Sequence, residues 1–360
     1  MKIVVQKFAG RISARFICLG AIVALLAACS DGDGSNTLFE EVPSLDLAFT
    51  ASPIDVQNSQ AQFAQNVAYG DEERNLFDIW LPDSDGPTPL AIYIHGGAFR
   101  GGDKAIEEGP LADIVRELLD RGIAVASSTY YLLSTDPVDT NGVMKSLNDS
   151  KRALQFMRYH ARSLNIDPDN VAIFGGSAGA GTALWLGTHD ELAEPDSTDP
   201  ILRQSSRVQA VGALATQATY ELVRWEQVLQ DAIAPFAALL GGTDIVTISN
   251  AVGATDLLLA FLAIDSVDQI DSPEARAIRE NIDMLALMDS SDAPIYVSNT
   301  TPSPDDLVDL LFHHALHARA LKETADAVGL ESVVYADDPS FSIVDPSGED
   351  LVSFISRHIN

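Results

Sequence analysis

The sequence predicts an α/β fold in which a mostly parallel central sheet is flanked by helices on both faces. Short apolar runs such as Leu90 to Ile94 and Val171 to Phe174 alternate with helix-forming stretches such as Glu108 to Arg121. Uninterrupted apolar runs are typical of strands buried on both faces, and their alternation with helices is typical of parallel crossovers. The 360 residues, 46% of them hydrophobic, suffice for one large domain with an insertion.

The individual elements follow from apolar spacing and from turn residues. We expect strands at 67–69, 76–81, 90–94, 123–127, 171–174, 208–215, 294–298 and 331–336, and helices at 108–121, 143–164 and 180–186. Between 220 and 292 the alternation stops, and three helix-like runs rich in Leu, Phe and Trp take its place. We interpret 220–292 as a helical cap insertion, which either shapes a pocket or simply enlarges the core.

The N-terminal residues 1–28 have the features of an export signal. Lys2, Lys7, Arg11 and Arg15 precede an apolar stretch too short to span a bilayer, and the stretch ends at Cys29. Leu26-Ala27-Ala28-Cys29 looks like a bacterial lipobox, so we expect lipidation at Cys29, although a plain secretory signal is the alternative. Residues 29–62 are polar and predict a flexible tether, which leaves 63–360 as the folded domain.

The charge balance limits the partners that can be expected. Residues 1–28 hold four of the 22 basic residues and none of the 52 acidic ones, so their removal leaves 18 against 52, a formal charge of −34. Such an acidic chain is repelled by nucleic acids and anionic membrane surfaces, so any membrane attachment is expected through the lipid alone. With Cys18 and Cys29 as its two cysteines, the chain has no basis for a thiolate metal site or a cysteine nucleophile.

Ser177 stands between glycines at a predicted strand-to-helix corner, in Gly175-Gly176-Ser177-Ala178-Gly179. A serine in this arrangement is lifted clear of the sheet, with the N-terminus of the next helix pointing at it. Upstream, a predicted buried strand runs into His95-Gly96-Gly97-Ala98-Phe99. Gly96 and Gly97 allow a close approach of backbone N–H groups, which, with the N–H of Ala178, would form an oxyanion hole.

The two motifs in this order resemble the α/β-hydrolase carboxylesterases, in particular their hormone-sensitive-lipase-like and feruloyl-esterase-like branches. The resemblance is specific from about Val67 to Gly187 and looser after Val208. It implies the α/β-hydrolase fold and an ester cleavage that needs no cofactor. It also implies a nucleophile, an acid and a histidine in this chain order, with the acid after the seventh core strand and the histidine after the eighth.

The histidine departs from this pattern, because the segment Asp337 to Asp345 after the eighth predicted strand contains none. His313 and His314, which follow the seventh predicted strand, are therefore the candidate bases. Asp305 and Asp306 are the candidate acids. The alternative for both histidines is a surface or helix-capping role.

Two further interpretations remain open at the site. His313 and His317 stand four residues apart beside Asp309, a spacing that also suits a metal site, although no second ligand cluster is evident. The missing histidine would also fit a hydrolase scaffold that has lost catalysis and binds a ligand, and an exopeptidase would share the same machinery. We expect a cofactor-independent serine esterase acting on a small-molecule ester, exported and lipid-anchored, of undetermined oligomeric state.

Overall fold

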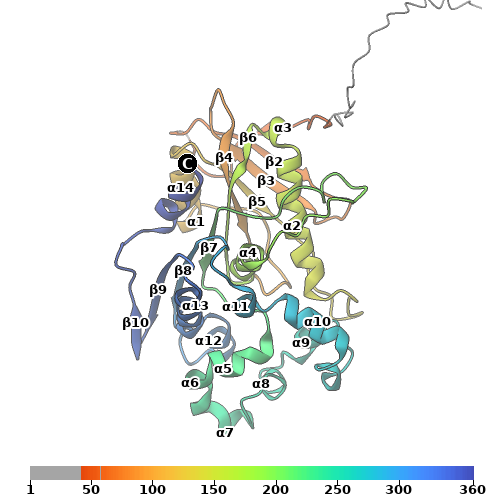
Figure 1. Ribbon diagram of the computed structural model, residues 1–360, viewed down its shortest axis with the longest axis vertical. Helices are drawn as coiled ribbons and strands as arrows, with labels where there is room; N and C mark the ends of the chain where they lie inside the picture. Colours follow the sequence, from red (N-terminus) through yellow and green to blue (C-terminus); the bar gives the residue numbers. More distant parts are fainter. Residues whose placement is uncertain (1–41, 57) are drawn as a thin grey trace, which may run out of the picture. The chain divides into compact units, whose positions relative to one another are not determined.

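A computed structural model describes residues 42–56 and 58–360, and its centre is one twisted sheet (Figure 1). The strand order is β1-β2-β3-β5-β4-β6-β7-β8-β9-β10. The six strands from β5 to β9 in this order run parallel, and antiparallel strands complete both edges. The strands are β1 (Phe49–Thr50), β2 (Gln62–Ala68), β3 (Leu76–Leu81), β4 (Thr88–Ile94), β5 (Ala124–Ser128), β6 (Ile166–Gly176), β7 (Ala210–Leu214), β8 (Ile295–Thr300), β9 (Ser332–Asp338) and β10 (Phe341–Ile343). The predicted fold class is confirmed.

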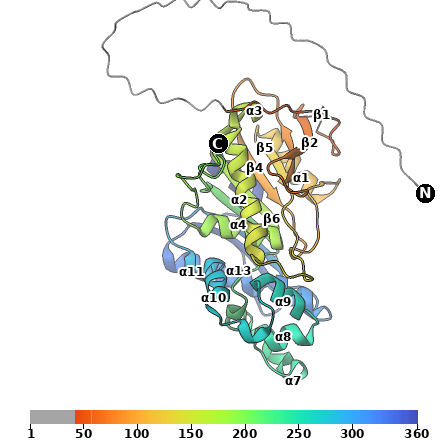
Figure 2. The same cartoon turned by 90° about the vertical axis from the view of Figure 1, so that its right-hand side faces the viewer.

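Helices cover both faces of the sheet, and each face has its own hydrophobic core. On one face, α1 (Pro110–Asp120) and α14 (Leu351–Ile359) pack on the central strands. The other face carries α2 (Val143–Tyr159), α4 (Ala178–Thr188) and α13 (Ala315–Val328), as Figure 2 shows for α2 and α4. The helix expected over 143–164 is interrupted at His160, after which α3 (Ala161–Leu164) ends at Asn165 in the left-handed conformation.

The segment from 220 to 292 folds into short helices that gather at one end of the domain (Figures 1 and 2). One of the three helix-like runs, residues 221–240, forms several short turns, and one of its breaks falls at Pro235, which lacks the N–H that a continuous helix needs. The elements are η1 (Leu222–Arg224), α5 (Trp225–Val228), α6 (Gln230–Ile233), η2 (Ala234–Phe236), α7 (Ala237–Leu240), α8 (Ile245–Ala251), α9 (Thr255–Leu262), η3 (Val267–Gln269), α10 (Pro273–Asn281) and α11 (Met284–Leu287).

The residues just before β2 are not the free tether that the polar composition suggested. Strand β1 pairs with β2, the Trp80 indole donates to Ser52 Oγ at 2.9 Å, and Ile54 is buried. The folded domain therefore includes residues from 42 onward. The expectations for 1–28, for Cys29 and for the tether up to 41 lie outside the described residues.

Within the described residues, we find no single helix that is both long and apolar enough to cross a membrane. By length and composition one bent pair passes this criterion, Gln230–Leu240 with Ile245–Ala251, which meet at 58°.

Candidate active site

Ser177 lies at the sharp corner between β6 and α4, with φ 52° and ψ −120°. A non-glycine residue at positive φ costs about 1–3 kcal/mol and persists where its surroundings hold it in place. Added Cβ atoms on Gly175 and Gly179 would lie 2.7 and 1.9 Å from the backbone oxygen of Ile94, so both positions require glycine. The packing of α4 against β4 therefore forces the corner that presents the serine.

The imidazole of His313 contacts this serine. Ser177 Oγ lies 2.8 Å from His313 Nε2, and His313 Nδ1 lies 2.5 Å from Asp309 Oδ1. A carboxylate can only accept, so Nδ1 carries the proton and Nε2 is left to accept the serine hydroxyl proton. This is the tautomer that a general base needs.

Asp309 and His313 both lie on α12 (Leu307–His313), one helical turn apart, and the helix follows β8. The expectation that Asp305 or Asp306 orients the base is wrong. Asp306 instead caps the N-terminus of α12 by accepting from the Asp309 N–H at 3.0 Å, and Asp305 contacts Ser303. An Asp at the residue before a helix is suited to this capping role.

His314 is not the histidine that meets the serine. Its Nδ1 accepts from the Leu316 N–H at 3.1 Å and thereby caps α13, and its Nε2 faces Asp338 at 3.5 Å. The capping alternative therefore applies to His314, whereas His313 takes the position of the base.

The geometry that the metal alternative assumed is absent, because the helix breaks at His314 between His313 and His317. His317 is fully buried in α13, where Nδ1 accepts from the Ala218 N–H and Nε2 donates to the Leu311 carbonyl. Burial lowers the pKa of His317 to about 4, so this imidazole is neutral at pH 7. Across residues 42–56 and 58–360, no group of three or more His, Cys, Asp or Glu side chains is arranged to hold a metal ion.

The loop after β4 lies against the serine. An added Cβ on Gly96 would lie 3.2 Å from the Ser177 Cβ, and Gly97, Ala98 and Phe99 all have positive φ. Ala178 is the first residue of α4, so its N–H has no partner inside the helix. The structure thus brings Gly96 and Ala178 next to the serine, where an oxyanion hole needs its donors, whereas Gly97 packs against the backbone of Gly101.

A buried polar network holds this loop. His95 stacks on Tyr130, its Nδ1 donates to the Gly96 carbonyl at 2.7 Å, and Arg74 Nη2 donates to its Nε2 at 3.3 Å. The Tyr130 hydroxyl donates to the His95 carbonyl at 2.9 Å. Burial is the main cause of the lowered pKa of His95, which keeps the imidazole neutral and able to accept from Arg74. His95 therefore has a structural role in the loop.

An apolar cavity opens from Ser177 into the cap. It has about 850 Å³ of empty space, its mouth included, and its walls come from the Gly-rich loop, the cap helices and α12. Aromatic and aliphatic side chains dominate the lining: Phe99, Tyr220, Trp225, Leu229, Ile233, Ile248, Leu257, Leu258, Phe261, Leu311 and Phe312. The cavity can therefore hold an apolar group attached to a reacting carbonyl.

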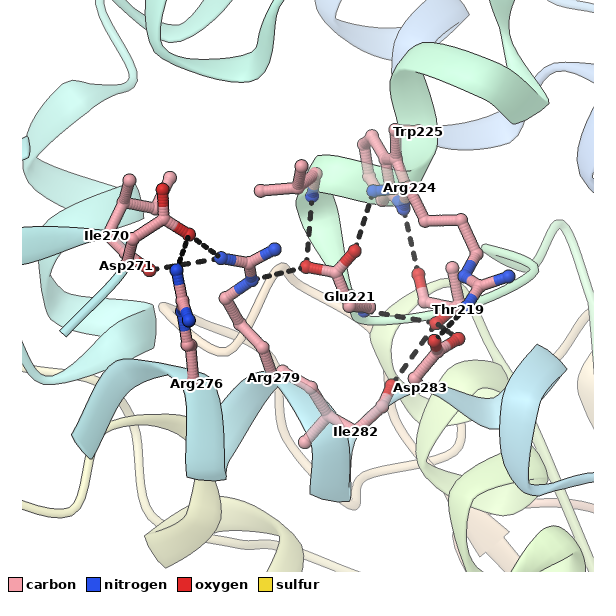
Figure 3. Close-up of polar contacts among 11 residues, drawn as sticks. Thr219, Glu221, Arg224, Trp225, Ile270, Asp271, Arg276, Arg279, Ile282 and Asp283 are labelled. Atoms are coloured by element: carbon pink, nitrogen blue, oxygen red, sulfur yellow. Dashed lines mark hydrogen bonds and ion pairs between the residues drawn. The ribbon is translucent and has the colours of Figure 1, made fainter. Parts of the chain in front are cut away.

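Ion pairs fix the cap segment that lines this cavity (Figure 3). Arg279 on α10 donates to Glu221 at 2.6 Å, and Glu221 also accepts from the Arg224 N–H at 2.7 Å. Asp283, which follows α10, pairs with the Arg224 guanidinium. These contacts tie α10 to the start of the cap and hold Trp225 in the cavity wall.

The fold and this site define an α/β hydrolase with a serine, histidine and aspartate in contact. The chain belongs to the BD-FAE family, whose model matches residues 77–304, more than half of the chain. This agrees with the expected resemblance to esterases of the α/β-hydrolase fold.

Curated relatives share shorter stretches with this chain. The probable carboxylic ester hydrolase LipM of Mycobacterium tuberculosis is 32% identical over 199 residues, which cover 52% of this chain and 41% of LipM. The probable isoprenylcysteine alpha-carbonyl methylesterase ICMEL1 of Arabidopsis thaliana is 29% identical over 152 residues, 42% of this chain and 30% of the relative. The matched region therefore spans less than half the length of each relative.

Solved structures match over more of the chain. A truncated form of a carbohydrate esterase from gut microbiota has a TM-score of 0.53 at 19% identity and covers 78% of this chain and 88% of its own. A bifunctional GH43-CE protein of Bacteroides eggerthii has a TM-score of 0.54 at 20% identity, and the match covers 85% of this chain and 39% of that protein. These likenesses establish the fold.

Proposed function

We propose that the protein hydrolyses carboxylic esters through an acyl-enzyme intermediate on Ser177. The observation that carries this proposal is the chain of contacts from Ser177 Oγ through His313 to Asp309, at 2.8 and 2.5 Å. The family and the printed names of the relatives, which include carboxylic ester hydrolase and methylesterase, support the same reaction class.

In the first step, the Ser177 proton passes to His313 Nε2 while Oγ bonds to the ester carbonyl carbon. The negative charge that develops on the carbonyl oxygen is stabilised by the N–H groups of Gly96, Gly97 and Ala178. Collapse breaks the bond to the alcohol oxygen, which takes the proton from His313. Water then attacks the acyl carbon and gives a proton to His313 Nε2, the bond between that carbon and Ser177 Oγ breaks, Oγ takes the proton back from His313, and the acid product leaves.

The substrate class follows from the cavity beside the serine. Its lining is predominantly apolar, and Phe99 and Phe261 pack edge to face with ring centroids 5.9 Å apart. An ester with an aliphatic or aryl group of moderate size would bury that group there and gain about 25 cal/mol per Å² of apolar surface removed from water. We therefore propose apolar acyl or aryl esters as the substrates.

The test is turnover of 4-nitrophenyl esters by the wild-type protein and by Ser177→Ala. We expect the substitution to remove at least about 10³-fold of the rate, because no other hydroxyl takes the place of the nucleophile. The variant should keep the wild-type melting temperature or exceed it, since alanine leaves the packing of the corner unchanged. Full turnover by Ser177→Ala would exclude this nucleophile.

A parallel assay with aminoacyl anilides separates esterase from exopeptidase action. If neither substrate class is turned over by the wild-type protein, then the binding-protein alternative replaces the esterase proposal.

We also propose that the protein is exported and anchored through a lipid on Cys29. The basis is the sequence alone: four basic residues, an apolar stretch and Leu26-Ala27-Ala28-Cys29.

A further inference from the structure

The helix that carries the base ends in backbone carbonyls that no helical turn can satisfy. The last four carbonyl groups of an α-helix lack intrahelical partners. At the end of α12 the groups concerned include those of Leu311, Phe312 and His313, whereas the carbonyl of His314 also accepts from the His317 N–H at 3.0 Å. His313 is the last residue of the helix, so any movement of this end displaces the imidazole from Ser177.

Buried side chains from outside α12 donate to each of these carbonyls. His317 Nε2 donates to Leu311 at 2.9 Å, and Gln217 Nε2 donates to Phe312 at 2.8 Å. Asn299 Nδ2 reaches the carbonyls of His313 and His314 at 3.3 and 3.4 Å. The exposed fractions of the Asn299 and Gln217 residues are 2% each, and that of His317 is 0%.

The donors are themselves fixed by one short stretch of backbone at the end of β7 and just beyond it. Asn299 Oδ1 accepts from the Thr216 N–H at 3.0 Å while its Nδ2 donates to the Thr216 carbonyl at 2.8 Å. This pairing also fixes which end of the amide is nitrogen, since a carbonyl must face a donor. His317 Nδ1 accepts from the Ala218 N–H at 3.1 Å.

The same stretch of backbone also holds the nucleophile, because the Ser177 N–H donates to the Leu214 carbonyl at 2.9 Å. Residues 214–218 therefore form hydrogen bonds both to Ser177 and to the side chains that hold the end of α12. Both reacting groups are set by hydrogen bonds to five consecutive residues.

We propose that Asn299 is a positioning residue for the base, with Gln217 in a supporting role, and this inference rests on the proposed esterase function. Asn299 joins β7 to the end of α12 and so fixes the separation between Ser177 and His313. Losing it would leave the carbonyls of His313 and Thr216 without this donor and allow the end of α12 to shift. A displacement of about 1 Å at a reacting group can cost about 10²-fold in rate.

The experiment compares Asn299→Leu with a matched control, Gln155→Leu. Both changes replace a buried amide by an apolar side chain of similar size. Gln155 Nε2 also donates to two backbone carbonyls, those of Leu202 and Gln204, but Gln155 neither lines the cavity nor bonds to Ser177, Asp309 or His313. The control therefore reports what the loss of a buried amide does to stability alone.

We expect Asn299→Leu to lower kcat for 4-nitrophenyl acetate by about 10-fold to 100-fold with KM changed less than about 2-fold. Gln155→Leu should lower the melting temperature comparably and leave kcat at the wild-type value. Wild-type kcat in folded Asn299→Leu would overturn the proposal, and so would an equal loss of kcat in both variants.

If Asn299→Leu does not fold, then Gln217→Met decides, since it removes the Phe312 contact and keeps the side-chain length. Loss of kcat on the small acetate ester supports the proposal, and unchanged kcat overturns it. Failure of the esterase function itself is recognised separately, because the wild-type protein would then be inactive or indistinguishable from Ser177→Ala.

Discussion

The pairing of Asp309 with His313 depends on helical geometry at the scale of single residues. Side chains four residues apart on a helix are neighbours on one face, so a carboxylate there can meet an imidazole without any loop to position it. The Asp309 side chain is 47% exposed, and the His313 side chain is 23% exposed. Solvent therefore screens the charge of Asp309, and its main contribution is to fix the tautomer and the orientation of the ring.

We expect Asp309→Asn to lower kcat by about 10²-fold or more, because an amide can donate to Nδ1 and so stabilise the tautomer with the proton on Nε2. The steady-state rate on an aryl ester measures this. Asp306→Asn is the control, because asparagine also caps helices well and Asp306 does not touch His313. Equal rates in both variants would contradict the role of Asp309.

The acid was missed by sequence reasoning for a physical reason. The fold usually supplies the acid from a loop after the seventh core strand, so Asp305 and Asp306, close to the end of that strand, were the natural candidates. The visible signal was the spacing from Asp309 to His313, but that spacing is also common in surface ion pairs of helices. Whether the spacing marks a catalytic pair or a surface ion pair depends on where α12 begins, and α12 begins after Asp306, which caps it.

At the scale of elements, α13 couples the site to the stability of the domain through His317. The pKa of this buried imidazole is about 4 in the folded state, against about 6.5 in an unfolded chain. Between these values the unfolded chain binds more protons, so the free energy of unfolding rises with pH. The stabilisation is complete above about pH 6.5 and is lost as the pH falls toward 4, by up to about 3 kcal/mol.

We therefore expect the urea midpoint of the wild-type protein to fall more between pH 7 and pH 5 than that of His317→Gln. The variant is less stable at pH 7, but it has no imidazole to protonate at this position. Equilibrium unfolding at both pH values measures the difference. An equal fall of the urea midpoint in the two proteins would mean that His317 does not cause the pH dependence. Other buried histidines, such as His95 and His189, would then be its source, because burial also lowers their pKa values.

The elements of the sheet could be predicted well because each core strand is a short apolar run between turn residues. The strand over 76–81 has the expected bounds, and the strand over 90–94 was short by two residues. The cap was harder, since its helices are short and their apolar residues face a cavity as well as a core. Local spacing could not show that Tyr220 would place its ring against Gly181 in α4, because that contact joins residues distant in sequence.

At the scale of the whole molecule, the net negative charge bears on how the protein could attach to a membrane. The chain carries a formal charge of −30, so its surface is repelled by an anionic bilayer. The lipid on Cys29 that we propose would overcome this repulsion, because one acyl chain binds only marginally, whereas several chains on one residue hold firmly.

We expect Cys29→Ala to move the protein from the membrane pellet to the soluble fraction of an expressing bacterium. Esterase activity per molecule should stay at the wild-type value, because residues from 42 onward form the folded domain. Fractionation followed by an activity assay checks both points. A variant that remains in the pellet after a high-salt wash would contradict the lipid attachment.

The base and its acid occupy one continuous stretch of five residues, 309–313, so the site places few demands on the segment after β9. Where the histidine and the aspartate come from separate loops, an insertion or deletion in either loop moves one side chain away from the other. Here the connection after β9 has no such duty, and it forms the β9–β10 hairpin instead. Changes in the length or sequence of that hairpin should therefore leave the positions of the base and the acid unchanged.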